Sequence, residues 1–491
     1  MRKRLLTLLL LLGALASTWV FWHVRDRNRG YQLDLDLRAP ANAPPLPLRV
    51  GFGRMKMTPD LSRPVWLAGF ANGRRATAVH DDLWAVAAVI DDGSHRVGIV
   101  ALDAIGLFHD DVVAIRQLLT PGARLDYLIV ASTHTHSAPD LMGIWGPRTG
   151  VSGVDADYRR QVIDAAAGAV ITAVGSMEPA YFTAREIPVP TEGLVADTRD
   201  PQVFDATVRM MLFLNPLTGR TIGSIVNWGN HPETPWSDNT AITADFPGYL
   251  REALARGVQV EGKTVARGLG GIHLFVNGAI GGLMTTDPAT TVVDPFDGRA
   301  YGPPSHEKAR AVGHRLADAV FSSLEAEAPV PQPRPLLHIV ARSLLLSLDN
   351  PLFRLASAVG TIDRGQPAWN TVRTELALLT LGTASIACVP GELYPEIANG
   401  GVVRAPGADF DVEPIEVPPL RTLMPGEVKF LFGLANDEIG YIIPKSEWDD
   451  REPWLYGAPA RPYGEVNSLG AETAPRLHDA FKELAASFAQ P

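Results

Sequence analysis

Cysteine is almost absent from this chain of 491 residues, in which Cys388 is the only one. A single cysteine excludes an intrachain disulfide and any metal site built from several thiolates. Basic residues give no positive field either, because 44 lysines and arginines are outnumbered by 54 aspartates and glutamates, for a net charge of −10. The composition therefore argues against a nucleic-acid partner, and any metal would be held mainly by histidines and carboxylates.

Fixed-period repeats and low-complexity segments are also absent, whereas hydrophobic residues make up 46% of the chain and charged residues 20%. This balance is typical of a folded protein with a sizeable core. We see no internal linker after about residue 48, so we predict one large domain over residues 48–491. Apolar positions at helical spacing predict helices over residues 157–174, 306–327 and 478–488, between many short apolar runs. The predicted fold class is α/β, with mixed β-sheets flanked by helices.

The only long uncharged run is Leu5 to Trp22, behind a basic triplet at residues 2–4. Its 18 residues exceed the usual core of a signal peptide, about 7–15 residues, and reach the lower limit for a membrane-spanning helix. Ala14-Leu-Ala could be a cleavage site, but the apolar run continues beyond it. Residues 1–25 are thus predicted to be a signal anchor or a signal peptide. The domain over residues 48–491 would then lie on the periplasmic or extracellular side, or be secreted, behind a Pro/Ala-rich tether over residues 26–47.

Several strand-like runs end in polar residues. The runs that begin at Arg96, Tyr127, Ile222, Ala384 and Lys429 lead into Asp103, His134, His231, Glu392 and the Asn436–Tyr441 segment, respectively. In open α/β sheets, ligands bind at the carboxyl ends of strands. These five endings therefore predict one converging site.

The histidines indicate the chemistry of that site. His134 and His136 are two residues apart, so in an extended chain both imidazoles point the same way. With His231 they supply the number of ligands that a catalytic zinc site uses. Glu392 follows an apolar run, where a carboxylate needs a partner or a metal. Each residue alone also fits an ordinary structural role, and Tyr441 alone fits a core tyrosine best.

Together, these segments resemble the neutral, non-lysosomal ceramidase family. The matching segments keep the family's order over about residues 48–470: Val50-Gly-Phe-Gly-Arg, Ala131-Ser-Thr-His-Thr-His-Ser-Ala-Pro, Asn227-Trp-Gly-Asn-His-Pro, Ile242-Thr-Ala-Asp-Phe-Pro-Gly-Tyr, Val389-Pro-Gly-Glu and Asn436 to Tyr441. The resemblance implies a ceramidase catalytic-domain fold with Zn²⁺ as cofactor. It implies that the zinc ligands are His134, His231, Glu392 and Tyr441, with His136 close to the metal.

The chain departs from the family's pattern at the catalytic serine. Met284 stands at the position of the serine and Gly282 at that of a preceding aspartate, while Thr285 and Thr286 are out of register. The resemblance also does not extend to the family's C-terminal immunoglobulin-like domain. We therefore expect a reaction that needs no protein nucleophile.

The sequence thus predicts an exported, zinc-dependent hydrolase that cleaves an amide (N-acyl) bond with a zinc-activated water. His136 and Asp245 are the expected catalytic residues, for proton transfer or for orienting their neighbours. Two alternatives stay open: a zinc esterase or lactonase using the same site, and a non-catalytic, metal-containing binding protein. The expected partners are a small-molecule or lipid N-acyl substrate and, through the N-terminal segment, a membrane. The sequence does not predict the oligomeric state.

Weaker candidates surround this set. Asp103 and Asp140 could orient ligands, although each is also explained as a carboxylate that caps a loop. Gly278, Gly281 and Gly282 could present backbone N–H groups to an oxyanion, although a tight turn explains them better.

Overall fold

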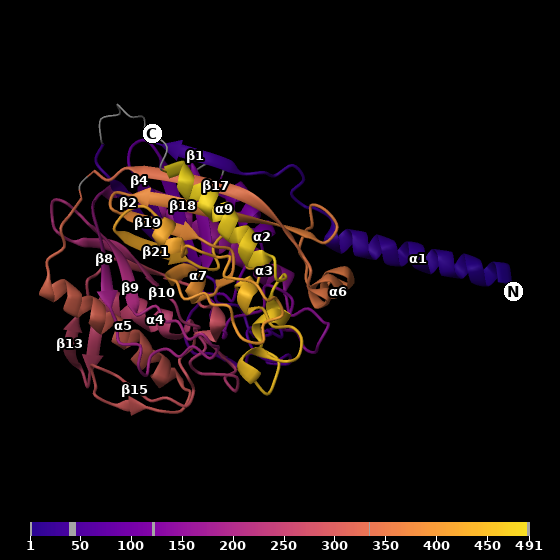
Figure 1. Cartoon of the computed structure of the whole chain (residues 1–491). Helices are drawn as coiled ribbons and strands as arrows, with labels where there is room; N and C mark the ends of the chain where they lie inside the picture. Colours follow the sequence, from indigo (N-terminus) through magenta and orange to yellow (C-terminus); the bar gives the residue numbers. More distant parts are fainter. Residues whose placement is uncertain (1, 39–45, 120–122, 333, 489–491) are drawn as a thin grey trace.

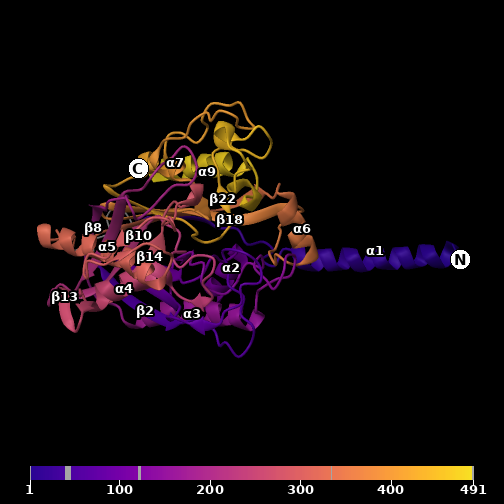
Figure 2. The same cartoon turned by 90° about the horizontal axis from the view of Figure 1, so that it is seen from below.

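The computed structural model describes residues 2–38, 46–119, 123–332 and 334–488 (Figure 1). Three sheets form the body of the molecule, and helices cover their outer faces. Figure 2 shows the N-terminal elements and the C-terminal elements on opposite sides of this body. The predicted class, α/β with mixed sheets flanked by helices, is confirmed.

The first sheet comes from the N-terminal third of the chain. Its order is β6 (Tyr127–Ser132), β5 (Arg96–Leu102), β4 (Trp84–Asp91), β2 (Arg49–Lys56) and β7 (Glu178–Pro179). Helices α2 (His109–Leu119) and α3 (Ala156–Gly175) cover its outer face with alanine, valine and leucine side chains. A Cβ at Gly51 or Gly53 would lie 2.0 or 2.3 Å from a backbone oxygen of α3. The glycines of the Val50-Gly-Phe-Gly-Arg segment thus allow close helix–strand packing.

The second sheet has the order β14 (Ile272–Asn277), β10 (Thr221–Trp228), β9 (Thr207–Leu214) and β8 (Tyr181–Pro188). Helices α4 (Asp245–Arg256) and α5 (His306–Ala326) cover it on the outside. The prediction of a helix over residues 306–327 is confirmed, as is that over residues 157–174 in α3.

The third sheet contains most of the C-terminal strands. Its order is β1 (Asp34–Arg38), β17 (Leu337–Ser347), β18 (Thr371–Leu381), β19 (Ala384–Cys388) and β21 (Val428–Phe432). Its outer face carries α7 (Pro395–Asn399), α8 (Leu420–Leu423) and α9 (Thr473–Phe488). Helix α9 begins five residues before the predicted helix over 478–488, because Thr473 to Leu477 are buried with it apart from Arg476.

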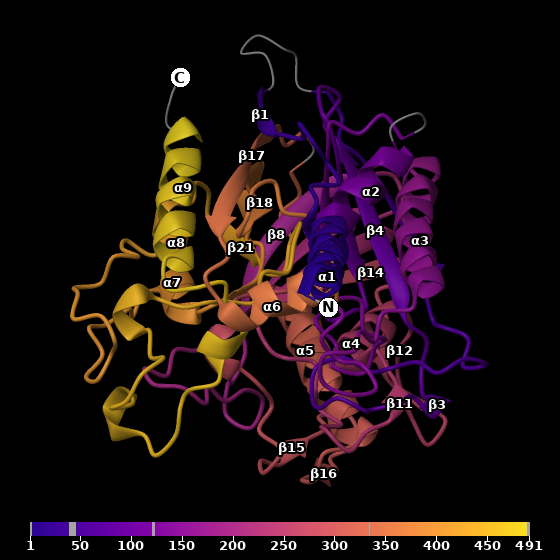
Figure 3. The same cartoon turned by 90° about the vertical axis from the view of Figure 1, so that its right-hand side faces the viewer.

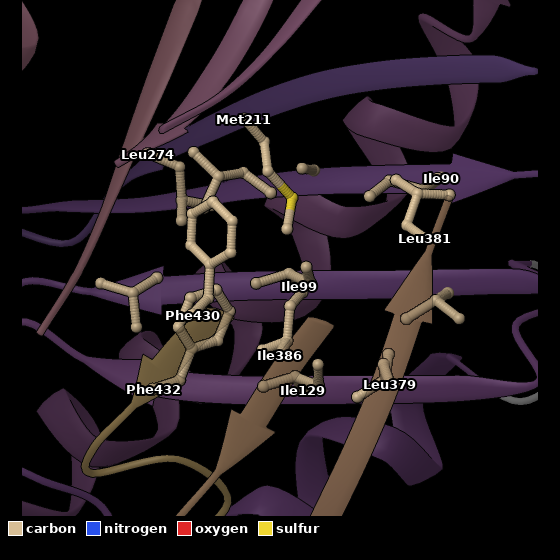
Figure 4. Close-up of a cluster of buried hydrophobic side chains, with 14 of the residues drawn as sticks. Ile90, Ile99, Ile129, Met211, Leu274, Leu379, Leu381, Ile386, Phe430 and Phe432 are labelled. Atoms are coloured by element: carbon tan, nitrogen blue, oxygen red, sulfur yellow. The ribbon is translucent and has the colours of Figure 1, made fainter. Parts of the chain in front are cut away.

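The inner faces of the three sheets share one apolar core. Figure 4 shows Ile99 and Ile129 of the first sheet facing Leu379, Ile386 and Phe430 of the third. Met211 and Leu274 of the second sheet complete this cluster. Burial of this surface is the main stabilising term of the body, at roughly 25 cal/mol per Å² of apolar area.

Each sheet also contains one parallel pair: β5 with β6, β10 with β14, and β19 with β21. The segment that follows β21 bonds to β6 and β14, through Asn436 N–H to Val130 O at 2.6 Å and Gly433 N–H to Asn277 O at 3.0 Å. These contacts bring the segment after β21 beside β6 and β14, and this arrangement positions the site.

Short elements complete the fold. They are β3 (Ala78–Val79), β11 (Ala241–Ile242), β12 (Gly257–Val260), β13 (Lys263–Arg267), β15 (Val292–Val293), β16 (Ala300–Tyr301), α6 (Pro351–Val359), β20 (Glu392–Leu393) and β22 (Tyr441–Ile442), with single 3₁₀ turns at Gly281–Leu283, Lys445–Glu447, Leu455–Gly457 and Gly464–Asn467.

The N-terminal run forms helix α1 (Arg2–Val24), which projects from the body (Figure 1). It is the one helix in the described residues that is long and apolar enough to span a membrane, with a mean hydropathy of 2.0. Residues 26–47 were predicted to form an extended tether. The part that the structure describes is instead bound to the body of the protein. Asp34–Arg38 pairs with β17, and Asp26 forms an ion pair with Arg373. Residues 39–45 of that tether lie outside the described residues.

Candidate metal site

His134 and His136 follow β6 and face one cavity, with ring centroids 5.1 Å apart. An extended chain was predicted at these two residues. The chain turns here instead, because His134 has a φ of 71°. This left-handed conformation is costly for a side chain other than glycine. It is held by the bond from His134 N–H to Ala104 O at 2.9 Å. A turn, rather than the pleat of a strand, thus directs both rings to the same side.

His134 and His231 are oriented by main-chain oxygens. His134 Nδ1 lies 2.6 Å from Ile105 O, and His231 Nδ1 lies 2.7 Å from Met284 O. A carbonyl can only accept, so each Nδ1 carries a hydrogen. The Nε2 of His134 is left with a lone pair, whereas His231 Nε2 donates to the Glu392 carboxylate. The two Nε2 atoms lie 3.6 and 3.0 Å from Glu392 Oε2. Binding through Nε2, with Nδ1–H held by a carbonyl, is the arrangement of metal-ligating histidines.

Glu392 and Tyr441 reach the same point from two paired strands. β20 and β22 are parallel, with Glu392 directly opposite Tyr441. Burial raises the pKa of the Tyr441 phenol well above its usual range, and the nearby Glu392 carboxylate adds to this. Burial also opposes ionisation of Glu392, but the two histidines outweigh it and lower the pKa of that carboxyl.

The pKa values of His134 and His231 shift in opposite directions. Burial lowers the pKa of His134 to about 3, so its imidazole is neutral. Burial also lowers the pKa of His231, but the hydrogen bond to Glu392 outweighs this effect, so the pKa of His231 is raised. The cluster thus offers a neutral donor, a carboxylate and an imidazole whose proton a cation would displace.

His136 is held from three sides. Its Nδ1 lies 3.0 Å from Glu233 Oε2, and the Arg74 guanidinium donates to its carbonyl oxygen at 3.2 Å. A Cβ at Gly69 would lie 2.3 Å from His136 Cγ, so the ring packs directly on that glycine. Burial opposes ionisation of Glu233, yet His136 holds the pKa of that carboxyl down to about 2. The ring therefore has a fixed position beside a permanent carboxylate.

The three buried imidazoles could hold a metal ion, because each offers a ligand nitrogen and these nitrogens lie within 4.8 Å of one another. Imidazole and carboxylate donors suit Zn²⁺. The Nε2 of His136 is buried and has no hydrogen-bond partner among the described residues. The donor set therefore fits the implied metal; the His136 ring centroid lies 5.1 and 5.5 Å from those of His134 and His231, which are 4.9 Å apart.

Asp245 has a different setting. Its carboxylate accepts from Thr234 N–H at 2.8 Å and from Phe246 N–H at 2.5 Å, at the start of α4. Burial raises the pKa of Asp245 to about 7. The contact with Thr234 fixes the backbone directly after Glu233. This arrangement suits a role in orienting that segment rather than contact with the imidazoles.

The weaker candidates have structural partners. Asp103 forms a two-pronged ion pair with Arg251, at 2.8 and 2.6 Å. Asp140 accepts four backbone N–H groups from the loop that follows it, from Met142, Gly143, Trp145 and Gly153. Gly278 N–H donates to Trp228 O at 3.0 Å, and a Cβ at Gly281 or Gly282 would meet Tyr394 or Asp197. These glycines thus form a packed turn.

The Met284 side chain is fully buried in the apolar cluster beneath α4 and α5. Thr286 donates to Leu194 O at 2.7 Å and accepts from Asn230. Thr285 forms a backbone bridge with His231. The segment therefore positions His231 through its main chain.

An apolar pocket ends at the cluster and encloses about 780 Å³ of atom-free space, part of it open to solvent. Its polar end includes His134, His136, Glu392 and Tyr441. Its walls include Phe108, Met142, Leu348, Phe353, Val372 and Leu469. Trp145 and Tyr463 also line the pocket.

Two acids of this site had no predicted role. Glu233 ends the Asn-His-Pro-Glu segment, and Glu438 lies three residues before Tyr441. Glu438 lines the pocket, its Oε1 accepts from Gly440 N–H at 2.7 Å, and its Oε2 is buried without a partner among the described residues. Burial, with Glu392 nearby, raises its pKa well above the usual range. Glu438 lies inside a segment that matches the ceramidase family and Glu233 directly follows another, and this position was the signal that could have identified them.

No family model matches this chain, and no curated protein sequence does. Its structure, however, is similar to the crystal structure of neutral ceramidase from Pseudomonas aeruginosa, with a TM-score of 0.66 and 15% identity. The match covers 90% of this chain and 74% of that one. A ceramidase complexed with C2 matches with a TM-score of 0.65 and 15% identity, over 90% and 75% of the two chains. The resemblance inferred from the sequence is thus confirmed for the fold.

Proposed function

We propose that this chain is a zinc-dependent hydrolase that cleaves the amide bond of an N-acylated, lipid-like substrate. The observation that carries the proposal is the apolar pocket ending at His134, His136, Glu392 and Tyr441. Such a pocket suits an acyl chain with a polar head at its inner end. The structural similarity to ceramidases supports an amide as the bond to be cleaved.

His134, His231, Glu392 and Tyr441 would hold the metal. When bound, a zinc ion polarises a carbonyl group and lowers the pKa of water. The main-chain carbonyls of Ile105 and Met284 keep the two Nε2 atoms pointed at the ion's position. The pairing of β20 with β22 keeps the carboxylate and the phenol together.

His136 would move the proton. Glu233 beside Nδ1 favours the tautomer with hydrogen on that atom, which leaves Nε2 to accept a proton from the attacking water and return it to the leaving amine. Asp245 would position the 231–234 segment through Thr234. No serine is needed for this route, in agreement with the buried Met284.

The test combines metal content with hydrolysis of paired acyl-amide and acyl-ester probes of equal chain length. We expect His134→Ala and His231→Ala to lose bound zinc and at least 100-fold in kcat/KM. His136→Ala should lose activity but keep zinc; loss of zinc would make His136 a ligand instead. His273→Ala, which removes an equally buried histidine bonded to Ser224, is the matched control.

The same assay separates the alternatives. Cleavage of the ester probe alone would favour an esterase or lactonase. Bound zinc without cleavage of either probe would favour a binding protein. Unchanged zinc in both His134→Ala and His231→Ala would refute the proposed site.

A further inference from the structure

Helix α1 is joined to the body without a free linker. Gln366 N–H donates to Val24 O at 2.9 Å, and Arg25 forms a backbone bridge with Gln366. Asp26 then pairs with Arg373 through two bonds of 3.0 and 2.9 Å. The body therefore has a set orientation relative to the helix axis.

Helix α6 lies beside the base of α1. Figure 3, which looks along α1 from its N-terminus, shows α6 on the face from which α1 projects. The indole N–H of Trp19 donates to Val359 O at 3.2 Å, and a Cβ at Gly360 would touch the ring of His23. The two helices are thus in direct contact.

The outer side of α6 is apolar and exposed. Leu352, Leu355 and Val359 are 58%, 59% and 47% exposed, at a spacing that places them on one helix face. Trp369, 67% exposed, follows in the segment that binds Val24 and Arg25. At the end of α1, the Arg25 guanidinium stacks on Trp22, 3.6 Å from its ring centroid. Aromatic and arginine side chains at the end of a spanning helix are typical of the layer between lipid and water.

The inner side of α6 belongs to the pocket. Phe353 and Ser357, four residues apart, line it, and so does Gln366. One short helix thus separates an exposed apolar stripe from the cavity that leads to His134 and Glu392.

We propose that the stripe of Leu352, Leu355 and Val359, with Trp369, lies in the interfacial layer of the bilayer that α1 spans, and that the pocket receives its substrate from that layer. The occupant of this surface is the bilayer itself, because the stripe is continuous with the base of an apolar helix of 23 residues. The second part, delivery of an N-acyl lipid, rests on the proposed function.

The test of the surface uses the full chain in phosphatidylcholine vesicles. Leu355→Cys carries an environment-sensitive fluorophore, and the single native Cys388 is buried. Lipids brominated on the acyl chain should quench this label at least twofold more than a label at Leu217→Cys, which is 92% exposed in the turn between β9 and β10. Equal quenching at the two positions would overturn the proposal. A blue-shifted but unquenched label would indicate a protein partner and would overturn it too.

The test of delivery is separate. Leu352→Asp with Leu355→Asp should lower hydrolysis of a bilayer-embedded N-acyl lipid at least tenfold and leave a short, water-soluble N-acyl probe unaffected, with Leu217→Asp as control. Equal hydrolysis of the embedded lipid by both variants would refute delivery. If the unaltered protein cleaves neither substrate, the proposed hydrolase and delivery from the bilayer both fail, while the quenching experiment still decides the surface.

Discussion

Gly69 shows how one residue without a side chain can decide the position of another. It has a φ of 101°, and a Cβ there would lie 2.3 Å from His136 Cγ. Gly69→Ala should displace the imidazole and lower kcat/KM at least tenfold while zinc stays bound, since the new Cβ would overlap the ring of His136. Zinc titration and kcat/KM check this expectation.

Gly73→Ala is the matched control for that substitution. Gly73 has a similar φ of 85° in the same loop, but the nearest atom to its Cβ would be 3.7 Å away. Equal losses in the two variants would indicate backbone strain and not contact with His136.

Asp245 is predicted to make stability depend on pH. Burial raises the pKa of its carboxyl to about 7 in the folded protein, against about 3.9 in the unfolded chain. An acid whose folded pKa is raised stabilises the fold below the unfolded pKa, and this stabilisation is lost as pH rises through the folded pKa. The shift corresponds to a change on the order of 4 kcal/mol between about pH 4 and pH 7.

Asp245→Asn removes this titration. Urea denaturation from pH 4 to pH 8 should show the variant gaining free energy of unfolding relative to the unaltered protein as pH rises. A difference between the two proteins that stays constant with pH would contradict the shift.

Polar residues at strand ends predicted that the histidines and Glu392 meet, whereas Tyr441 was added only through the family resemblance. His134, His231, Glu392 and Tyr441 lie together, although their binding of a metal stays a prediction. Glu233 and Gly69 were missed because their roles depend on contacts across the fold, Glu233 with His136 and Gly69 with the same ring. Asp103 was explained only by the position of Arg251, which lies 148 residues away.

At the scale of elements, the packing of α3 on β2 depends on glycine. A Cβ at Gly53 would lie 2.3 Å from Ala169 O and 2.6 Å from Ala173 N, which are main-chain atoms that cannot rotate away. Gly53→Ala should lower the free energy of unfolding by about 1–3 kcal/mol, as other overpacked cores do. Thermal or urea unfolding measures it. Gly175→Ala, with no atom within 4 Å, should leave stability nearly unchanged, and a comparable loss there would argue against packing as the cause.

Periodicity predicted helices α3 and α5 closely, because each has a long amphipathic pattern and an N-terminal cap, Asp155 or Ser305. It did not predict β1, since Asp34–Arg38 reads as a polar connection until β17 is placed beside it. Helix α6 was not predicted, because its leucines lie on an exposed face, where a surface helix usually carries polar residues.

At the scale of the whole molecule, the proposed metal would connect the segments that follow β6, β10, β19 and β21. A ligand that binds only the folded state stabilises it, by about 4 kcal/mol when its free concentration is 1,000 times its Kd. Chelation should therefore lower the free energy of unfolding by about that amount relative to zinc-saturated protein.

The control for chelation is the double variant His134→Ala and His231→Ala, whose unfolding should respond to neither zinc nor chelator. If chelation leaves the unaltered protein equally stable, the strand ends are not joined by a metal.

His231 is oriented by the main-chain oxygen of residue 284, an atom that every amino acid carries. The side chain at that position can therefore be exchanged during evolution while the imidazole keeps its direction. A reactive side chain could thus be gained or lost at position 284 while His231, a proposed ligand, keeps its place.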